Sequence, residues 1–107
     1  MWTIEYHSDR VAQDVLKLPS GQLARYIHFA ELMAEFGPNL GMPHTRAMGD
    51  GLYEIRIKAV EGIARVFYCT LVEKRIVVLH SFIKKTQNTP TRELETARRR
   101  MREVKHK

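Results

Sequence analysis

Three strand-like runs follow one another closely in the second half of the chain, and they constrain the fold more than any other feature. The runs are "LYEIRIKAV" (52–60), "IARVFYCTLV" (63–72) and "RIVVLHSFI" (75–83). Each is rich in β-branched and aromatic residues, as half-buried strands are. Two residues separate each run from the next, whereas parallel strands need a connection of about a dozen residues or more. The sequence therefore predicts an antiparallel three-strand meander.

Short turns also predict which side chains share a face of the meander. A turn at Val60–Glu61 or at Glu61–Gly62 places even-numbered residues of the first run beside odd-numbered residues of the second. With a further turn at Glu73–Lys74, one face collects cations and other side chains, namely Arg56, Lys58, Arg65, Phe67, Cys69, His80 and Phe82. The opposite face is almost wholly apolar and predicts a core, made of Tyr53, Ile55, Ile57, Ala64, Val66, Tyr68, Val77, Leu79 and Ile83.

Helical signals follow a short strand, "WTIEYH", in the first half of the chain. Asp9 suits the N-cap of a first helix that Pro19 ends, and Ser20 suits the N-cap of a second helix that ends near Gly37. Apolar residues recur at helical spacing in both, at Val11, Ala12, Val15 and Leu16 and then at Leu23, Ile27, Ala30 and Ala34. We expect these helices to form a hairpin over the apolar face. The stretch 39–51, "NLGMPHTRAMGDG", predicts a loop.

Positive charge concentrates at the C-terminal end. The chain has 18 Lys and Arg against 12 Asp and Glu, a net charge of +6, and nine of the 18 lie in residues 84–107. The segment "TRELETARRRMREVKHK" has the composition of a basic helix. An excess of this kind favours polyanionic partners, and nucleic acid is the leading class. The alternative is a solvated helix whose charges serve solubility.

Length and cysteine content bound the remaining possibilities. A chain of 107 residues buries one sizeable core, which predicts a single domain over residues 1–107. One cysteine and no His/Cys cluster at metal-binding spacing predict neither a disulfide nor a structural metal, and we expect no cofactor. No apolar run approaches the length of a membrane span, so we expect a cytoplasmic protein without a membrane partner.

The predicted cationic face is a candidate anion site. Placing Arg56 or Lys58 across from Arg65 costs stability through like-charge proximity, unless an anion or a carboxylate such as Glu54 lies between them. Lys84 and Lys85 follow the third run and would form the rim of a phosphate site. The alternative is that Glu54 or Glu61 pairs with the arginines as surface ion pairs of little energetic value, with the lysines merely solvated.

The stretches "GLYEIRIKAVEGIARVFYC" and "RIVVLHSFIKKTQNTPTRELETARRRM" resemble the RelE/ParE superfamily of type II toxins, in its HigB-like, phage-derived Gp49-like branch. The resemblance covers nearly the whole chain. It implies a compact α/β (α+β) RelE-like fold with an N-terminal strand, a helical hairpin, an antiparallel three-strand meander and a C-terminal helix. It also implies a toxin that cuts mRNA in the ribosomal A site, so that translation stops until a cognate antitoxin binds.

The antitoxin of this branch is often a helix-turn-helix protein, and the resemblance implies operator DNA as a partner only through the toxin–antitoxin complex. Two other functions stay open. ParE-like members of the superfamily inhibit DNA gyrase without nuclease chemistry. A non-catalytic nucleic-acid-binding module is the other alternative, and it would bind RNA without cutting it.

The reaction that the resemblance implies is metal-independent endonucleolysis. A ribose 2′-hydroxyl attacks the adjacent phosphorus, which gives a cyclic phosphate and a free 5′-hydroxyl. Arg56 and Arg65 suit the binding of the phosphate and its developing charge. Lys84 or Lys85 would add charge and protonate the leaving oxygen, and His80 is a candidate base whose alternative is a structural role.

Further residues are candidates for RNA contact. They are His44 (also a second candidate base), Arg46, Lys58, Phe82 as a stacking platform, and Arg98 and Arg99 of the basic segment. Several superfamily members carry a reactive tyrosine near the C-terminus, but no tyrosine follows Tyr68 in this sequence. The identity of the acid and base therefore stays open, whereas the assignment of the phosphate-binding arginines does not depend on it.

Overall fold

Three helices and five strands form the part of the chain that the computed structural model describes, residues 1–85 and 90–106. In chain order they are β1 (Thr3–Tyr6), α1 (Asp9–Leu16), α2 (Ser20–Phe36), β2 (Thr45–Gly49), β3 (Leu52–Ala59), β4 (Gly62–Leu71), β5 (Arg75–Lys84) and α3 (Thr91–Lys105). The predicted α/β (α+β) class and the order of its predicted elements are confirmed. The polar loop predicted after Lys85 falls on residues 86–89, outside the described residues. None of the described helices is long and apolar enough to cross a membrane.

The five strands form one mixed sheet in the order β1–β5–β4–β3–β2. The meander is as predicted, because β3 pairs antiparallel with β4 and β4 with β5, while β1 runs parallel to β5. The β3–β4 hairpin turns at Val60–Glu61, since Ala59 pairs with the residue that follows this turn. This register sets Arg56 directly across from Arg65, on one face of the sheet.

Strand β2 corrects the prediction of a loop over residues 39–51. Thr45 pairs with Ile55 and Arg46 with Glu54, so the segment adds an edge strand to the meander. Its Gly, Pro and Asn content hid the strand, because pairing with a neighbour outweighs weak intrinsic preference. The hairpin that follows turns at Asp50–Gly51, where both residues have positive φ (56° and 88°). An Asp-Gly pair is a strong hairpin signal, which the sequence reading did not use.

A bulge in β5 corrects part of the face assignment. Phe67 pairs with His80 but Tyr68 pairs with Val78, so Leu79 is an extra residue on β5. The register predicted from a two-residue turn is correct from the Phe67–His80 pair to the Lys84 end of β5. Between the bulge and the β4–β5 turn it is wrong by one residue, because three residues connect β4 to β5. Val77 and Leu79 consequently pack on the face of Phe67 and Cys69, not on the hairpin face predicted for them.

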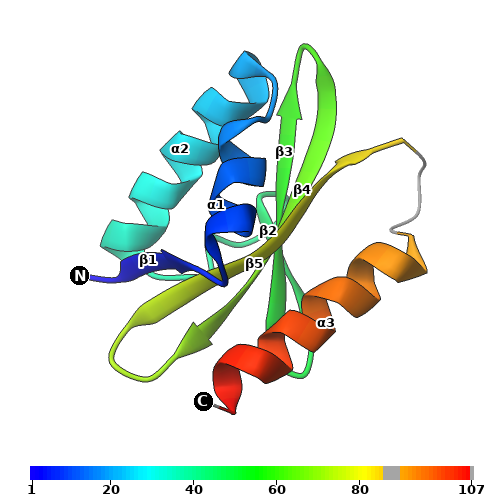
Figure 1. Cartoon of the computed structure of the whole chain (residues 1–107). Helices are drawn as coiled ribbons and strands as arrows, with labels where there is room; N and C mark the ends of the chain where they lie inside the picture. Colours follow the sequence, from blue (N-terminus) through cyan, green and yellow to red (C-terminus); the bar gives the residue numbers. More distant parts are fainter. Residues whose placement is uncertain (86–89, 107) are drawn as a thin grey trace.

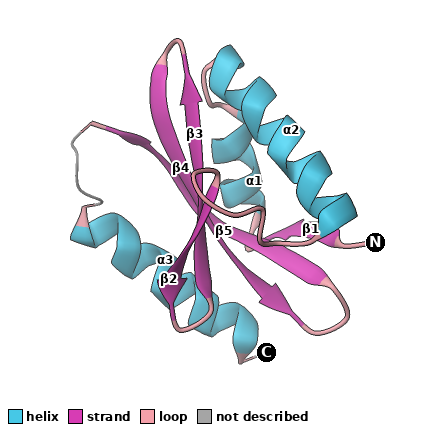
Figure 2. Cartoon of the chain, turned by 180° about the vertical axis from the view of Figure 1, so that it is seen from behind, coloured by secondary structure: helices cyan, strands magenta, loops and turns pink. Residues whose placement is uncertain are grey.

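Helices cover both faces of the sheet, with α1 and α2 on one and α3 on the other (Figure 1, Figure 2). The α1–α2 face holds the larger core, which includes Val11, Val15, Phe29, Met33, Ile55, Ile57, Ala64, Val66 and Tyr68. The predicted hairpin over the apolar strand face is therefore confirmed. Its buried stripe differs in detail, because Tyr26 is buried and Ile27, predicted as core, is 47% exposed.

The α3 face is divided between a core and a cavity. Its core contains Leu52, Phe67, Cys69, Val77, Leu79, Ala97 and Met101. Arg56 and Arg65, which lie nearer the β3–β4 turn, are outside this core and line a cavity instead. One sheet face thus supports α3 at one end and presents cations at the other.

The first helix begins differently from the prediction. Ser8, not Asp9, is the N-cap of α1, and its hydroxyl accepts a hydrogen bond of 3.2 Å from the Val11 amide. Asp9 is the first helical residue, where its negative charge interacts favourably with the positive end of the helix dipole.

The N-terminus of the second helix is capped by a residue from another part of the chain. Pro19 occupies the N-cap position of α2, and Ser20, the predicted cap, is already helical. The Gly21 amide donates a hydrogen bond of 2.8 Å to Glu61 Oε2 of the β3–β4 turn. Glu61 therefore satisfies a free amide at the start of α2.

Candidate active site

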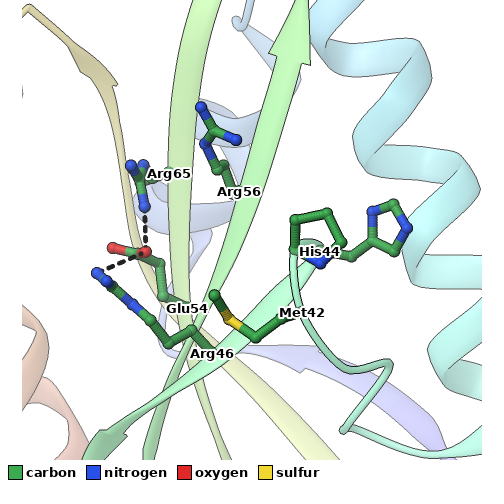
Figure 3. A pocket seen from close by; sticks show the side chains of 7 residues that line it. Met42, His44, Arg46, Glu54, Arg56 and Arg65 are labelled. Atoms are coloured by element: carbon green, nitrogen blue, oxygen red, sulfur yellow. Dashed lines mark hydrogen bonds and ion pairs between the residues drawn. The ribbon is translucent and has the colours of Figure 1, made fainter.

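A cavity of about 230 Å³ opens on the sheet face that α3 leaves uncovered (Figure 3). It is lined by Met42, Pro43, His44, Arg46, Glu54, Arg56 and Arg65. Strands β2, β3 and β4 supply the charged residues, and the loop before β2 supplies the others. The pairing of Arg46 with Glu54 and of Arg56 with Arg65 brings these four side chains together.

Glu54 lies buried beneath the arginines. Glu54 is 1% exposed and Arg65 6% exposed. The Arg65 guanidinium donates to Glu54 Oε1, and Arg46 Nη2 lies 3.3 Å from the same oxygen. This carboxylate offsets the like-charge proximity of Arg56 and Arg65. Of the two carboxylates considered from sequence, Glu54 makes the ion pair and Glu61 caps α2.

Arg56 differs from the other two arginines of the cavity. It is half-buried and makes no side-chain hydrogen bond or ion pair within residues 1–85 and 90–106. Two buried atoms beside it, Arg65 Nε and Glu54 Oε2, also have no hydrogen-bond partner in that part of the chain. Buried polar groups in proteins are nearly always paired, and unpaired ones often mark functional sites. The cavity therefore contains polar groups that a ligand could engage.

The two lysines after β5 have different surroundings. Lys84 is half-buried, pairs with Ile63 of β4 and so follows Phe82 on the arginine face. Burial, followed by the charges of Arg65, Arg56 and Arg46, lowers the pKa of Lys84, although Glu54 acts in the opposite direction. Lys85 is exposed and lines a separate surface hollow with Phe82 and Arg92. Lys84 therefore interacts with the charges of the cavity, whereas Lys85 lies in the separate hollow.

His80 joins β5 to α3. Its Nε2 lies 3.0 Å from Glu93 Oε1, and its Nδ1 lies 3.2 Å from Arg100 Nη1, which also donates to the Leu79 carbonyl at 2.9 Å. Because an arginine can only donate, Nδ1 is the acceptor and Nε2 carries the proton that Glu93 accepts. Both ring nitrogens are engaged, and His80 is not among the residues that line the cavity.

Of the residues predicted from sequence to contact RNA, some line the cavity and others lie outside it. Arg46 lines the cavity, and Lys58 is exposed farther along β3. His44 also lines the cavity, but its ring points toward α2 and lies 5.2 Å from the Phe29 ring (Figure 3). Phe82, across from Arg65, is half-buried.

Two neighbouring arginines of α3 have opposite surroundings. Arg98 donates to the carbonyls of Met48 (2.8 Å) and Gly49 (3.3 Å), so it ties α3 to the end of β2. Arg99 is exposed on the outer surface of the helix. Of this predicted pair, Arg99 is the one that faces solvent.

Residues 13–102 match the family model described as Phage derived protein Gp49-like (DUF891). The chain belongs to this family. The Gp49-like family is part of the RelE/ParE-like superfamily of toxins in toxin–antitoxin systems, as the sequence resemblance implied. Membership of this family implies a cognate antitoxin as partner. No curated protein matches the chain.

Three cavity residues of the Gp49-like chain were not predicted as site residues from its sequence. Glu54 was considered only as an ion-pair partner, although its position two residues before Arg56 puts it on the same face. Met42 and Pro43 carried no signal, because the path of a loop before an unrecognised strand cannot be derived from its composition.

The arrangement in the Gp49-like chain suits an anion with several oxygens. Three guanidinium groups from three adjacent strands line one cavity. A single guanidinium group can donate hydrogen bonds to two phosphate oxygens at once. In the described part of the chain, no cluster of His, Cys, Asp or Glu is arranged to hold a metal ion. The cavity side chains by themselves can therefore bind a phosphate and stabilise added negative charge on it.

Proposed function

We propose that this Gp49-like chain is the toxin of a type II toxin–antitoxin system and acts in the cytoplasm as a ribosome-dependent mRNA endoribonuclease. The observation that carries the proposal is the cavity lined by Arg46, Arg56 and Arg65, two of which pair with the buried Glu54 carboxylate, with Lys84 in the field of these charges. A protein that only binds gyrase has no need of a cavity lined by three arginines. A cognate antitoxin, of helix-turn-helix type, neutralises the toxin.

Arg56 and Arg65 bind the scissile phosphate in this proposal. Glu54 holds Arg65 in place, whereas Arg56 makes no side-chain hydrogen bond or ion pair among the described residues and can engage the ligand. The 2′-hydroxyl gives its proton to solvent water as its oxygen attacks phosphorus, and the bond from phosphorus to the 5′-oxygen breaks. Negative charge grows on the non-bridging oxygens during this step, and both guanidinium groups stabilise it. Glu54 is a positioning residue, because it fixes the guanidinium of Arg65 before RNA arrives.

Lys84 protonates the leaving 5′-oxygen. Its lowered pKa makes it a better proton donor than an ordinary lysine, and its strand position points it to the arginine face. Lys85, the other candidate from sequence, contributes charge at the surface. We assign His80 a structural role, because proton uptake at Nδ1 would break its hydrogen bond from Arg100.

A reconstituted translation reaction tests the proposal through the variant Arg56→Ala. The wild-type chain should produce new 5′ ends inside the codon in the ribosomal A site of a defined mRNA. Loss of one preorganised donor to the developing charge should reduce cleavage by about 10²-fold to 10³-fold. Arg56 is half-buried and outside the Glu54 ion pair, so the variant should fold normally.

Lys17→Ala is the matched control, because it removes the same charge from an exposed position at the end of α1. It should leave cleavage unchanged. Intact mRNA with folded wild-type protein would contradict the nuclease, and inhibition of DNA supercoiling by gyrase would then be measured. Normal cleavage by Arg56→Ala would refute the role proposed for Arg56 but not the nuclease activity.

A further inference from the structure

The cavity has a second wall that the phosphate chemistry does not use. Met42 and Pro43, from the loop before β2, form this wall, and Met42 is 70% exposed. In Figure 3 the Met42 side chain extends toward Arg46 and Glu54, whereas the His44 ring points away toward α2. A large apolar side chain is thus presented to solvent at the edge of a cluster of charges.

Hydrogen bonds hold the backbone on both sides of Met42. Thr45 Oγ1 accepts from the Gly41 amide at 3.0 Å, and the Gly41 carbonyl accepts from the amides of His44 and Thr45, both at 3.0 Å. The Arg56 amide donates to the His44 carbonyl at 2.9 Å, which joins the loop to β3. These bonds hold the backbone that carries Met42, and the Met42 side chain itself is 70% exposed.

Packing anchors the loop as well. The Tyr68 hydroxyl donates to the Pro38 carbonyl, and the Leu40 amide donates to Thr45 Oγ1 at 3.0 Å. Leu40 is itself packed against the core beneath α2. The segment that carries Met42 is therefore attached to the sheet and to the hairpin side of the core, and it can hold a ligand in a defined place.

We propose that Met42, with Pro43, forms a nucleobase-binding subsite next to the phosphate-binding arginines. The occupant is one base of single-stranded RNA, adjacent to the phosphate held by Arg56 and Arg65. This inference rests on the proposed function, because it assumes that the anion in the cavity belongs to RNA.

The chemistry of the two walls favours a nucleotide over a protein side chain. A nucleotide combines an anion with a flat apolar ring, and the cavity combines three arginines with an apolar wall. A thioether is polarisable and packs well against aromatic rings. Every base has a π-face, so stacking on such a surface adds affinity without requiring one sequence.

Binding of short single-stranded oligonucleotides to the full chain tests the subsite, by fluorescence anisotropy at low salt. One probe carries bases on 2′-O-methyl riboses, which cannot be cleaved. The other has the same backbone with abasic positions. Met42→Ala should weaken binding of the base-bearing probe by about tenfold. It should change binding of the abasic probe by less than about twofold.

Two further variants complete the design. Met42→Leu keeps an apolar surface and should retain most of the affinity for the base-bearing probe. Leu16→Ala removes a side chain that is 65% exposed on α1, on the other side of the sheet, and should change neither affinity. Circular dichroism should show that all three variants are folded.

An equal effect of Met42→Ala on both probes, or no effect on either, would overturn the subsite. The Met42 surface would then be available to a protein partner. The result of this binding experiment can be distinguished from the result of the mRNA cleavage experiment. Base-dependent binding without mRNA cleavage would refute the nuclease and keep the subsite, whereas cleavage without base-dependent binding would do the reverse.

Discussion

Burial of Arg65 changes the expected result of removing it. From sequence alone, this arginine is an exposed phosphate ligand. In the structure it is 6% exposed and paired with Glu54, which is 1% exposed. Removing Arg65 would leave the buried Glu54 carboxylate with only Arg46, at 3.3 Å, to compensate its charge. A poorly compensated buried charge is more destabilising than the loss of the attraction itself. Arg65 therefore contributes to stability as well as to the proposed chemistry.

Arg65→Ala should lower the free energy of unfolding by about 3 kcal/mol, measured by urea denaturation. The double variant Glu54→Gln/Arg65→Gln removes both charges and should recover most of this loss. Both variants should cleave mRNA about 10²-fold to 10³-fold more slowly than the wild type, because each lacks the Arg65 guanidinium. A double variant as unstable as Arg65→Ala would contradict the assignment of the loss to an unpaired buried charge.

Lys84 and Lys85 should differ in the pH dependence of cleavage. A protonated Lys84 is the active form in our proposal, so the rate is highest below its pKa and falls as pH rises through it. Burial and the neighbouring arginines lower that pKa. The fall should therefore begin at lower pH than for an ordinary lysine, whose pKa is about 10.4.

Lys84→Ala should abolish this alkaline fall and reduce cleavage by about 10²-fold at neutral pH. Lys85→Ala should keep the fall, because Lys85 is exposed and lines a separate surface hollow, whereas Lys84 interacts with the charges of the cavity. Rate profiles of both variants in the translation reaction would check this. A profile that is flattened by Lys85→Ala and not by Lys84→Ala would reverse the assignment.

At the scale of the secondary-structure elements, α3 is attached to the sheet by directed polar contacts. Arg98 reaches the backbone of β2, Arg100 reaches the Leu79 carbonyl, and His80 binds Glu93. Ala97 and Met101 supply the apolar contacts beneath. Two of the six basic residues of this helix, Arg98 and Arg100, thus make structural contacts, which composition could not show.

Arg98→Ala and Arg99→Ala separate the structural charges of α3 from the solvent-facing ones. Arg98→Ala should lower the free energy of unfolding by about 1.5 to 3 kcal/mol, because it removes charge-assisted hydrogen bonds to two carbonyls. Arg99→Ala should change it by less than about 0.5 kcal/mol. Thermal or urea unfolding of the two variants measures the difference. Equal stabilities would mean that the Arg98 contacts contribute nothing in solution.

Whether an element was predicted correctly depends on how local its sequence signal is. The meander and the helical hairpin follow from residue periodicity and short turns, and both are confirmed. Strand β2 depends on its pairing with β3, and the bulge at Leu79 depends on a three-residue connection combined with the packing of α3. Such features arise from tertiary contacts, so periodicity in one strand cannot reveal them.

For the whole molecule, net charge and the cavity together determine how RNA binding should respond to salt. The chain carries a net charge of +6. Each phosphate that the protein neutralises on a single strand contributes about −0.7 to the slope of log affinity against log salt concentration. Binding of the uncleavable oligonucleotide should therefore weaken linearly on this scale.

Arg56→Ala should make that slope shallower by about 0.7, which corresponds to one lost phosphate contact. Lys17→Ala should leave it unchanged, because this lysine lies at the end of α1 and away from the cavity. Anisotropy titrations at several salt concentrations give both slopes. An equal change in the two variants would indicate that affinity depends on overall charge and not on the cavity.

Part of the candidate site could be derived from the sequence. Alternation along β3 and β4 put Arg56 and Arg65 on one face, and the structure places them there. The burial of Glu54 and the position of Met42 could not be derived, because both depend on β2 and on the loop before it. Sequence also left Lys84 and Lys85 equivalent, whereas their surroundings in the fold are different.

Arg65 and Phe67 lie two residues apart on the same face of β4, one in the cavity and the other in the core beneath α3. A change of volume at Phe67 would move the strand that carries Arg65, since close-packed interiors transmit strain. Selection for a stable chain and selection for an active one therefore act on the same few positions. The two traits have little freedom to evolve separately along this strand.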